Sequence, residues 1–183
     1  MTVSLQHIRQ VRAEADCLYT AEQVSAALDE LAKNITHKHQ NNNLLVLCVM
    51  NGGLIATAEL MLRLDFPLEQ DYLHATRYRG ETQGGELNWL VKSTHSLKDR
   101  HVLIVDDILD EGYTLAAIAE HCRQAGASSV ETVALVEKMH ERKEGIAADY
   151  VGLAVEDRYV FGYGMDYKGY LRNAPGIFAV KGM

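Results

Sequence analysis

The order of apolar and polar residues along the chain predicts strands that alternate with helices. Residues 21–40 carry apolar side chains at helical spacing, and residues 44–50 are continuously apolar, as in a strand buried on both faces. A second helix is expected over residues 53–64, and a third opens at Thr114. Further strands are expected at residues 68–78, 86–92, 102–105, 130–136, 150–155, 160–163 and 177–180. This alternation predicts an α/β fold with a mostly parallel twisted sheet and helices on both faces.

Polar residues mark both ends of the first expected helix. Thr20 precedes the helix, and Gln23 follows three positions later, which is the pattern of a capping box. Three asparagines at positions 41–43 end the apolar stripe. We therefore expect the helix to begin directly after Thr20.

Composition and charge bound the class of protein. With 183 residues, 48% of them hydrophobic, the chain is expected to form a single domain, residues 1–183, with a substantial core. It has no run of about 20 apolar residues and no apolar signal core at its start, so we expect a cytoplasmic protein without membrane contact. The formal net charge of −7 argues against a nucleic-acid partner. The three cysteines are widely spaced, which fits reduced thiols.

The segment 102–115 carries the strongest functional signal. An apolar strand leads to Asp106 and Asp107, which we place at its carboxyl end; Asp110 and Gly112 follow in a short loop. In open α/β sheets ligands bind outside the carboxyl ends of strands. The N-terminus of the helix that opens at Thr114 supplies free N–H groups for an anion. Together these features predict a site for a phosphorylated ribose.

This segment closely resembles the 5-phosphoribosyl-1-pyrophosphate (PRPP) signature of the type I phosphoribosyltransferases. That signature has a hydrophobic strand, two acids, two apolar residues and Asp-Thr-Gly-x-Thr. The chain departs from it at Glu111, where the family usually has threonine.

Three later features have ordinary structural explanations when each is taken alone. Lys138 follows the strand 132–137 and is more often a solvent-facing lysine. The aromatic and glycine-rich stretch 159–167 fits a β-turn with core aromatics, and Arg172 fits a surface position. In this order, after the aspartate signature, they extend the resemblance to the hypoxanthine-guanine phosphoribosyltransferases of purine salvage. The resemblance covers roughly residues 44–175.

The resemblance implies roles for the acids and for the phosphate loop. Asp106 and Asp107 would hold the ribose hydroxyls directly or through Mg²⁺, and Asp166 would bind the Mg²⁺ that carries pyrophosphate. Asp110 would lie by purine N7 as the general acid/base. The 5′-phosphate would be held by the loop residues Glu111, Gly112, Tyr113 and Thr114.

It also implies how the base and the leaving group would be bound. Lys138 would donate to O6 of the base, Tyr159 would stack on the base, and the Val160 backbone would meet its edge. Arg172 and Gly52 would contact pyrophosphate. A lid would include Tyr78, Arg79 and Gly80, although the serine that the family often has there is missing.

The resemblance implies a small hood, from about residues 1–20 and 158–183, over a core of about residues 36–157. The implied reaction joins PRPP to hypoxanthine or guanine, gives IMP or GMP and releases pyrophosphate; a homodimer or homotetramer is expected. Two alternatives stay open. One is a nucleotide-binding transcriptional or RNA-binding regulator with the same fold, which the acidic net charge disfavours. The other is a salvage enzyme for xanthine or another base.

Overall fold

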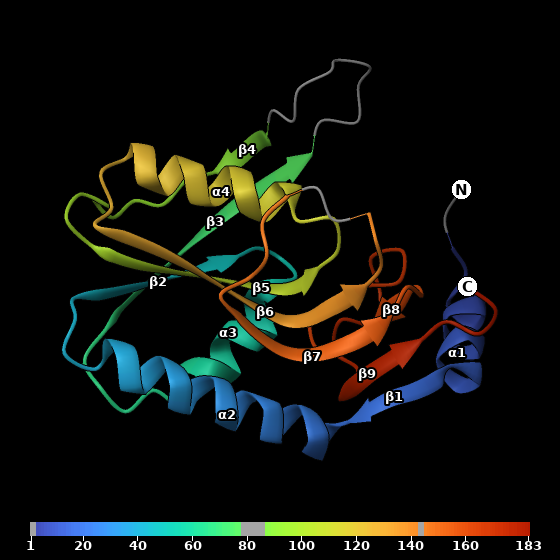
Figure 1. The fold of residues 1–183 in the computed structure, drawn as a ribbon. Helices are drawn as coiled ribbons and strands as arrows, with labels where there is room; N and C mark the ends of the chain where they lie inside the picture. The colour runs from blue at the N-terminus through green and yellow to red at the C-terminus, as the bar shows by residue number, and fades with distance from the viewer. Residues whose placement is uncertain (1–2, 78–86, 143–144) are drawn as a thin grey trace.

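The structure, a computed structural model, describes residues 3–77, 87–142 and 145–183. The lid residues Tyr78, Arg79 and Gly80 lie outside the described residues. The main sheet has the order β4-β3-β2-β5-β6-β7, and all of its neighbouring strands are parallel except β3 and β4 (Figure 1). Its strands are β2 (Leu44–Val49), β3 (Glu69–Arg77), β4 (Leu87–Val91), β5 (His101–Leu109), β6 (Ser129–Met139) and β7 (Tyr150–Glu156). The predicted α/β fold with a mostly parallel sheet is confirmed.

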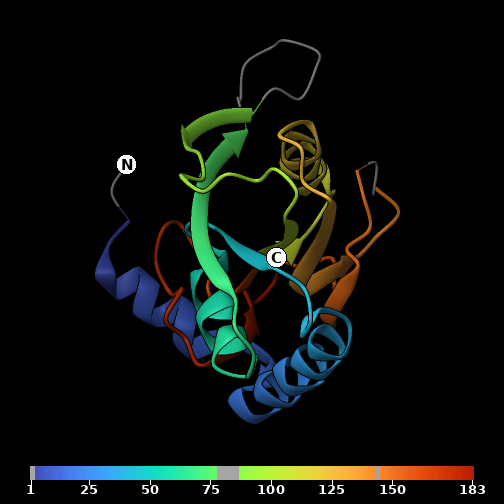
Figure 2. The same cartoon turned by 90° about the vertical axis from the view of Figure 1, so that its left-hand side faces the viewer.

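Helices cover both faces of this sheet. Helices α2 (Ala21–His39) and α3 (Gly53–Met61) lie on one face, and α4 (Tyr113–Gln124) lies on the other (Figures 1 and 2). Each face has its own hydrophobic cluster, because side chains of the buried strands alternate between the two sides. None of the described helices is long and apolar enough to cross a membrane.

Helix α2 follows its sequence signals closely. The Thr20 side chain accepts a hydrogen bond from the Gln23 N–H, and the Gln23 side chain accepts one from the Thr20 N–H. The predicted capping box is therefore confirmed. The apolar stripe of the helix is fully buried against the sheet and comprises Val24, Leu28, Leu31 and Ile35.

The two ends of the chain meet in a second, three-stranded sheet. Its order is β1-β9-β8, with antiparallel pairing throughout, and helix α1 lies beside it (Figure 1). The elements are α1 (Leu5–Glu14), β1 (Asp16–Thr20), β8 (Val160–Phe161) and β9 (Gly176–Ala179). Phe161 stacks on Phe178 with ring centroids 5.6 Å apart, and Ile8 of α1 belongs to the same hydrophobic cluster, so segments from opposite ends of the sequence share one small core. This sheet lies beyond the carboxyl ends of β6 and β7.

Strand β5 is longer than its sequence indicates. We predicted an end at the two acids, but the strand continues through Asp106 and Asp107 to Leu109. The reason is its neighbour β6, which pairs with β5 as far as Leu109 opposite Glu137. On its other side β5 pairs with β2 only as far as Val105 opposite Cys48. The acids therefore lie on a stretch of β5 that extends past the end of β2.

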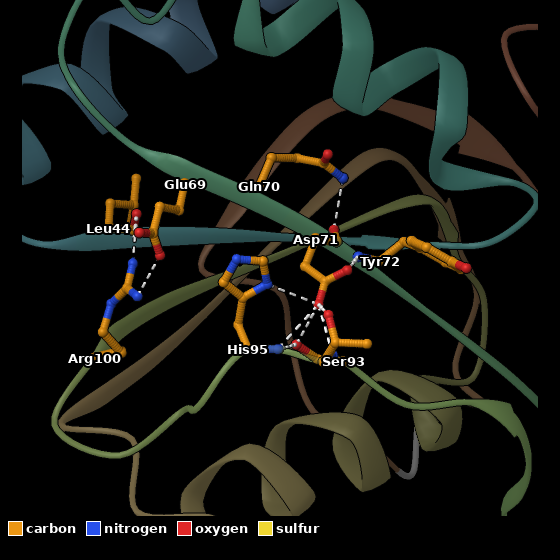
Figure 3. Close-up of polar contacts among 9 residues, drawn as sticks. Leu44, Glu69, Gln70, Asp71, Tyr72, Ser93, His95 and Arg100 are labelled. Atoms are coloured by element: carbon orange, nitrogen blue, oxygen red, sulfur yellow. Dashed lines mark hydrogen bonds and ion pairs between the residues drawn. The ribbon is translucent and has the colours of Figure 1, made fainter.

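A buried carboxylate fastens the chain after β4 to strand β3 (Figure 3). Asp71 Oδ1 accepts from the Tyr72 N–H. Its Oδ2 accepts from the Ser93 hydroxyl at 2.7 Å, the Thr94 N–H at 2.7 Å and His95 Nδ1 at 3.0 Å. Burial raises the pKa of Asp71, but these hydrogen bonds outweigh it and hold the pKa well below its ordinary value. These hydrogen bonds tie the segment 93–95, directly after β4, to the first half of β3.

We expect Asp71→Asn to lower the free energy of unfolding by about 2–3 kcal/mol at pH 7, because hydrogen bonds to a buried charged group are strong. A carboxylate with a depressed pKa stabilises the fold above its unfolded pKa of about 3.9 and loses that contribution as the pH falls through its folded pKa. The difference from the unsubstituted protein should therefore shrink below about pH 4. Urea unfolding at pH 7 and pH 3 measures it, with the exposed Asp65→Asn as the control. A difference that does not depend on pH would contradict this account.

Candidate active site

A cavity of about 630 Å³ opens at the carboxyl ends of β2, β5 and β6. It gathers residues from the turn after β2, the end of β5, the loop into α4 and the small sheet. The predicted site residues that line it are Gly52, Asp106, Asp107, Asp110, Glu111, Gly112, Thr114, Lys138, Tyr159, Val160, Asp166 and Arg172. Tyr113 is not among the described lining residues; it begins α4 and is partly exposed. Most of the residues that line the cavity were therefore predicted from the sequence. The role of each of these residues stays a prediction.

The turn after β2 packs directly on the acidic end of β5. A Cβ added to Gly52 would overlap the Asp107 carboxylate, so only glycine fits at this close approach. The Gly52 carbonyl in turn leaves no room for a side chain at Gly164. The peptide bond between Met50 and Asn51 in this turn is cis. The backbone of the turn thus forms one wall of the cavity beside the two acids.

The neighbouring side chains of Asp106 and Asp107 are both shielded from water. Asp106 Oδ1 accepts a hydrogen bond of 2.9 Å from the Asp107 N–H. Burial raises the pKa of Asp106 well above its ordinary value, and the neighbouring Asp107 carboxylate adds to this effect. Burial also raises the pKa of Asp107, while the positive charge of Arg172 opposes the increase. Two carboxylates in this state gain from a ligand that brings positive charge or hydroxyl donors to the cavity.

The loop after β5 leads into the N-terminus of α4. Gly112 is the N-cap and has φ = 86°, a left-handed conformation that glycine adopts without strain. The helix therefore begins at Tyr113, one residue before the predicted start at Thr114. The first N–H groups of a helix have no partner within the helix, and Gly112 and Thr114 line the cavity at this point. The loop has the geometry of an anion site.

Glu111 also lines the cavity. Its carbonyl accepts a hydrogen bond from the Gly145 N–H, so its backbone is tied to the chain after β6. The pKa of Arg142 is raised mainly by its hydrogen bond to Asp157, and the charges of Asp110 and Glu111 contribute to the same increase. The unusual glutamate thus belongs to a group of opposite charges at the rim of the cavity.

Asp110 is held by two basic side chains from the end of β6. Lys138 Nζ donates to Asp110 Oδ2 at 3.1 Å, and His140 Nε2 lies 2.6 Å from Asp110 Oδ1. Burial raises the pKa of Asp110, but the hydrogen bonds from His140 and Lys138 outweigh it, so the net pKa is lowered. Asp110 is therefore held as a carboxylate whose two oxygens both have donors.

Lys138 has a second acidic neighbour. Its Nζ lies 3.8 Å from Asp157 Oδ1, and Arg142 pairs with Asp157 Oδ2 at 2.8 Å. The Lys138 side chain is only 15% exposed, so its charge is balanced by Asp110 and Asp157 rather than by water. We placed Lys138 just after the strand, whereas it lies within β6. A longer β6 carries the ammonium group into the cavity.

The small sheet and the loop between β8 and β9 contribute further lining residues. Tyr159 lies next to Tyr167, with ring centroids 5.5 Å apart, and is itself 41% exposed. Arg172 Nη2 pairs with Asp166 Oδ1 at 2.6 Å, and Asp166 Oδ2 accepts from the Gly169 N–H. An aromatic ring, an acid and an arginine therefore line the same cavity as the paired acids of β5.

The donor set fits a hard divalent cation such as Mg²⁺, which prefers carboxylate oxygens and keeps waters and phosphate oxygens as further ligands. Asp106 and Asp107 meet this requirement, because their raised pKa values show an excess of desolvated negative charge. Asp166 fits as well, since a carboxylate oxygen that accepts one hydrogen bond still has a lone pair to offer.

His140 and Asp157 were missed from the sequence, although both hold the side chains that line the cavity. Strand alternation could have found His140, because residues two apart on a strand share a face and Lys138 had already been placed at this edge. Asp157 directly precedes Arg158 and Tyr159, where a lone acid after a strand resembles any solvated turn. Its partners become visible only in the fold.

The fold and this cavity define a phosphoribosyltransferase: the phosphoribosyl transferase domain family matches residues 14–168. The hypoxanthine-guanine phosphoribosyltransferase of Staphylococcus aureus is 33% identical, over 91% of this chain and 93% of that protein. The hypoxanthine-guanine-xanthine phosphoribosyltransferase of Tritrichomonas foetus is 31% identical, over 90% of each. The crystal structure of a hypoxanthine phosphoribosyltransferase from S. aureus superposes with a TM-score of 0.88 at 31% identity, covering 99% of this chain and 97% of that one. The chain belongs to the hypoxanthine-guanine phosphoribosyltransferase family.

Proposed function

We propose that the chain transfers the 5-phosphoribosyl group from PRPP to hypoxanthine or guanine, giving IMP or GMP and pyrophosphate. The observation that carries this proposal is the meeting, in one cavity, of a sugar-phosphate site and a base site. Asp106, Asp107 and the α4 N-terminus fit the ribose and its phosphate, while Asp110 and Lys138 fit a 6-oxopurine. The names of the relatives at 31–33% identity support the same bases.

In the proposed reaction, N9 of the base bonds to C1 of the ribose while the bond from C1 to the pyrophosphate oxygen breaks. Asp110 takes the proton from N7 as the base loses electron density to the new bond. The hydrogen bonds from His140 and Lys138 hold Asp110 in the ionised form, which is the form that can accept the proton. Lys138 donates to O6, which orients the base and stabilises the electron density that removal of the N7 proton leaves on O6.

The other residues bind and orient the reactants. The N–H groups of Gly112 and Thr114 and the Thr114 hydroxyl hold the 5′-phosphate, and Asp106 and Asp107 hold the ribose hydroxyls. Arg172 and the Gly52 backbone meet the pyrophosphate. Mg²⁺, when held by Asp106, Asp107 and Asp166, supplies positive charge that stabilises the leaving pyrophosphate. Tyr159 stacks on the base and excludes water from the site.

An assay with each base separately tests the proposal. Product formation from PRPP is measured with hypoxanthine, guanine, xanthine, adenine and uracil, with and without Mg²⁺. We expect Mg²⁺-dependent turnover with a 6-oxopurine and none with adenine or uracil, since the 6-amino group of adenine is itself a donor facing Lys138. Binding of IMP or GMP at 100 times its Kd should also stabilise the fold by about 2.7 kcal/mol in thermal unfolding. Nucleotide binding without turnover of any base would instead indicate a regulator.

Xanthine belongs in this assay for a specific reason. The T. foetus relative carries xanthine in its name and is as similar to this chain as the S. aureus relative to within 2% identity, 31% against 33%. Discrimination at purine C2 depends on groups near Tyr159–Asp166, where the chain offers mainly backbone atoms. Turnover of xanthine at a rate similar to guanine would extend the proposed function to three bases.

We further propose that the protein works in the cytoplasm as a homodimer or homotetramer, with a hood formed by the chain ends over the core. A solved structure of the Trypanosoma cruzi hypoxanthine phosphoribosyl transferase concerns the role of its C-terminal region in the oligomeric state; it has a TM-score of 0.85 and 28% identity to this chain. The small sheet built from both chain ends supports the proposed hood.

A further inference from the structure

The proton on His140 is placed by the backbone next to it. The Arg142 N–H donates to His140 Nδ1 at 3.1 Å. A nitrogen that accepts from an N–H group carries no proton of its own, so Nδ1 is unprotonated and the ring proton is on Nε2. Nε2 lies 2.6 Å from Asp110 Oδ1. His140 is therefore a neutral ring that donates to Asp110, and its side chain is only 6% exposed.

Binding of the base is expected to affect the two donors to Asp110, Lys138 and His140, differently. Lys138 holds Oδ2, and the proposed function requires this ammonium group to turn toward O6 of the base. His140 holds Oδ1 and is not among the described residues that line the cavity, so the base does not compete for it. Binding of the base therefore frees Oδ2 and leaves Oδ1 held.

We propose that His140 is the positioning residue for Asp110: by donating to Oδ1 it fixes the carboxylate so that Oδ2 is the oxygen that meets N7 of the purine. This inference rests on the proposed function and deepens it. It explains why a buried histidine follows Lys138 by two residues at the end of β6. It also assigns the two carboxylate oxygens different tasks, one structural and one in proton transfer.

The groups around Asp110 determine the pH dependence that follows. Lys138 on β6 and Arg142 in the turn after it are positive, and Asp157 after β7 is negative. Glu111 in the loop after β5 is also negative and acts on Arg142. His140 is the one neutral donor among these described neighbours. Its removal takes a hydrogen bond from the ionised form of Asp110 without changing the local charge, so the pKa of Asp110 must rise.

The experiment compares His140→Phe with His140→Gln in pH profiles of the forward reaction. Phenylalanine keeps a ring but removes the donor, and the glutamine amide can place an N–H near the position of Nε2. We expect the acid limb of kcat/KM for the base to move up by about one pH unit in His140→Phe. Its kcat should fall by about tenfold while the KM for PRPP changes by less than about threefold. His140→Gln should restore most of both properties.

Controls separate this inference from its alternatives. The exposed His37→Phe on α2 makes the same chemical change away from the cavity and should leave the profile unchanged. Equal impairment of the Phe and Gln variants, or no shift in either, would overturn the inference. If His140→Phe does not fold, nitrogen NMR of the unsubstituted protein decides, because a His140 ring without a proton on Nε2 excludes the assigned donor. Absence of turnover in the unsubstituted protein would refute the proposed function instead.

Discussion

Asp110→Ala should lower kcat by about 10²- to 10⁴-fold, the range that a positioned general acid/base supplies. The KM for PRPP should change far less, because in the proposed function Asp106, Asp107 and the loop at the α4 N-terminus hold that substrate. The structural reason is the position of Asp110 between the ribose acids and Lys138, with a depressed pKa that keeps it ionised. Steady-state kinetics with hypoxanthine and guanine measure both parameters.

Two further variants make this result specific. Asp110→Asn keeps the shape of the side chain and removes its basicity, so it should lose nearly as much kcat as Asp110→Ala. Asp65→Ala removes an exposed carboxylate outside the cavity and should have no effect. Thermal unfolding of each variant excludes a loss of folded protein. A fall in kcat of less than about threefold in Asp110→Ala would remove Asp110 from the proton transfer.

Strong local signals made most of the fold predictable. The capping box at Thr20 and the continuous apolar run of β2 depend on neighbouring residues alone, and both appear at nearly the predicted bounds. The N-terminal helix α1 and strand β1 were not predicted as separate elements. Strand β1 pairs only with β9, about 160 residues later, so its structure depends on a contact that local patterns do not contain.

The end of β5 shows the same limit at the site itself. Aspartate is disfavoured in strands, so two adjacent aspartates indicate the end of one. Pairing with β6 overrides this preference and extends β5 to Leu109. As a result the acids lie on a rigid strand rather than in a loop, which holds them more precisely beside Gly52. Pairing between β5 and β6 thus holds the two acids in a more rigid position than the sequence indicates.

The site residues that belong to a recognisable motif were predictable from the sequence. The residues that form ion pairs with them were not. The acids, Lys138, Arg172 and the predicted phosphate-loop residues other than Tyr113 all line the cavity. The residues that contact these lining side chains were not predicted. They are His140, Arg142 and Asp157, and their partners lie far from them in the sequence. Asp157, in the turn after β7, carries no signal until its partners in space, Lys138 and Arg142, are known.

Lys138→Gln should raise the KM for hypoxanthine and guanine by roughly 10- to 100-fold. A charged donor to a carbonyl contributes about 1.5–3 kcal/mol, and each 1.4 kcal/mol is a factor of ten. The Lys138 side chain is 15% exposed and its ammonium group lies 3.1 Å from Asp110, so it needs only to turn toward O6 when the base binds. Glutamine retains a donor but loses the charge.

The same substitution should also move the acid limb of the pH profile upward, because Asp110 loses a positive neighbour that lowers its pKa. The KM must therefore be measured on the pH plateau, where Asp110 is ionised in both proteins. Lys98→Gln, an exposed lysine outside the cavity, is the matched control. An unchanged KM for both 6-oxopurines would show that Lys138 serves only to balance Asp110 and Asp157, and the selection of 6-oxopurines would then have to come from the backbone near Tyr159 and Val160.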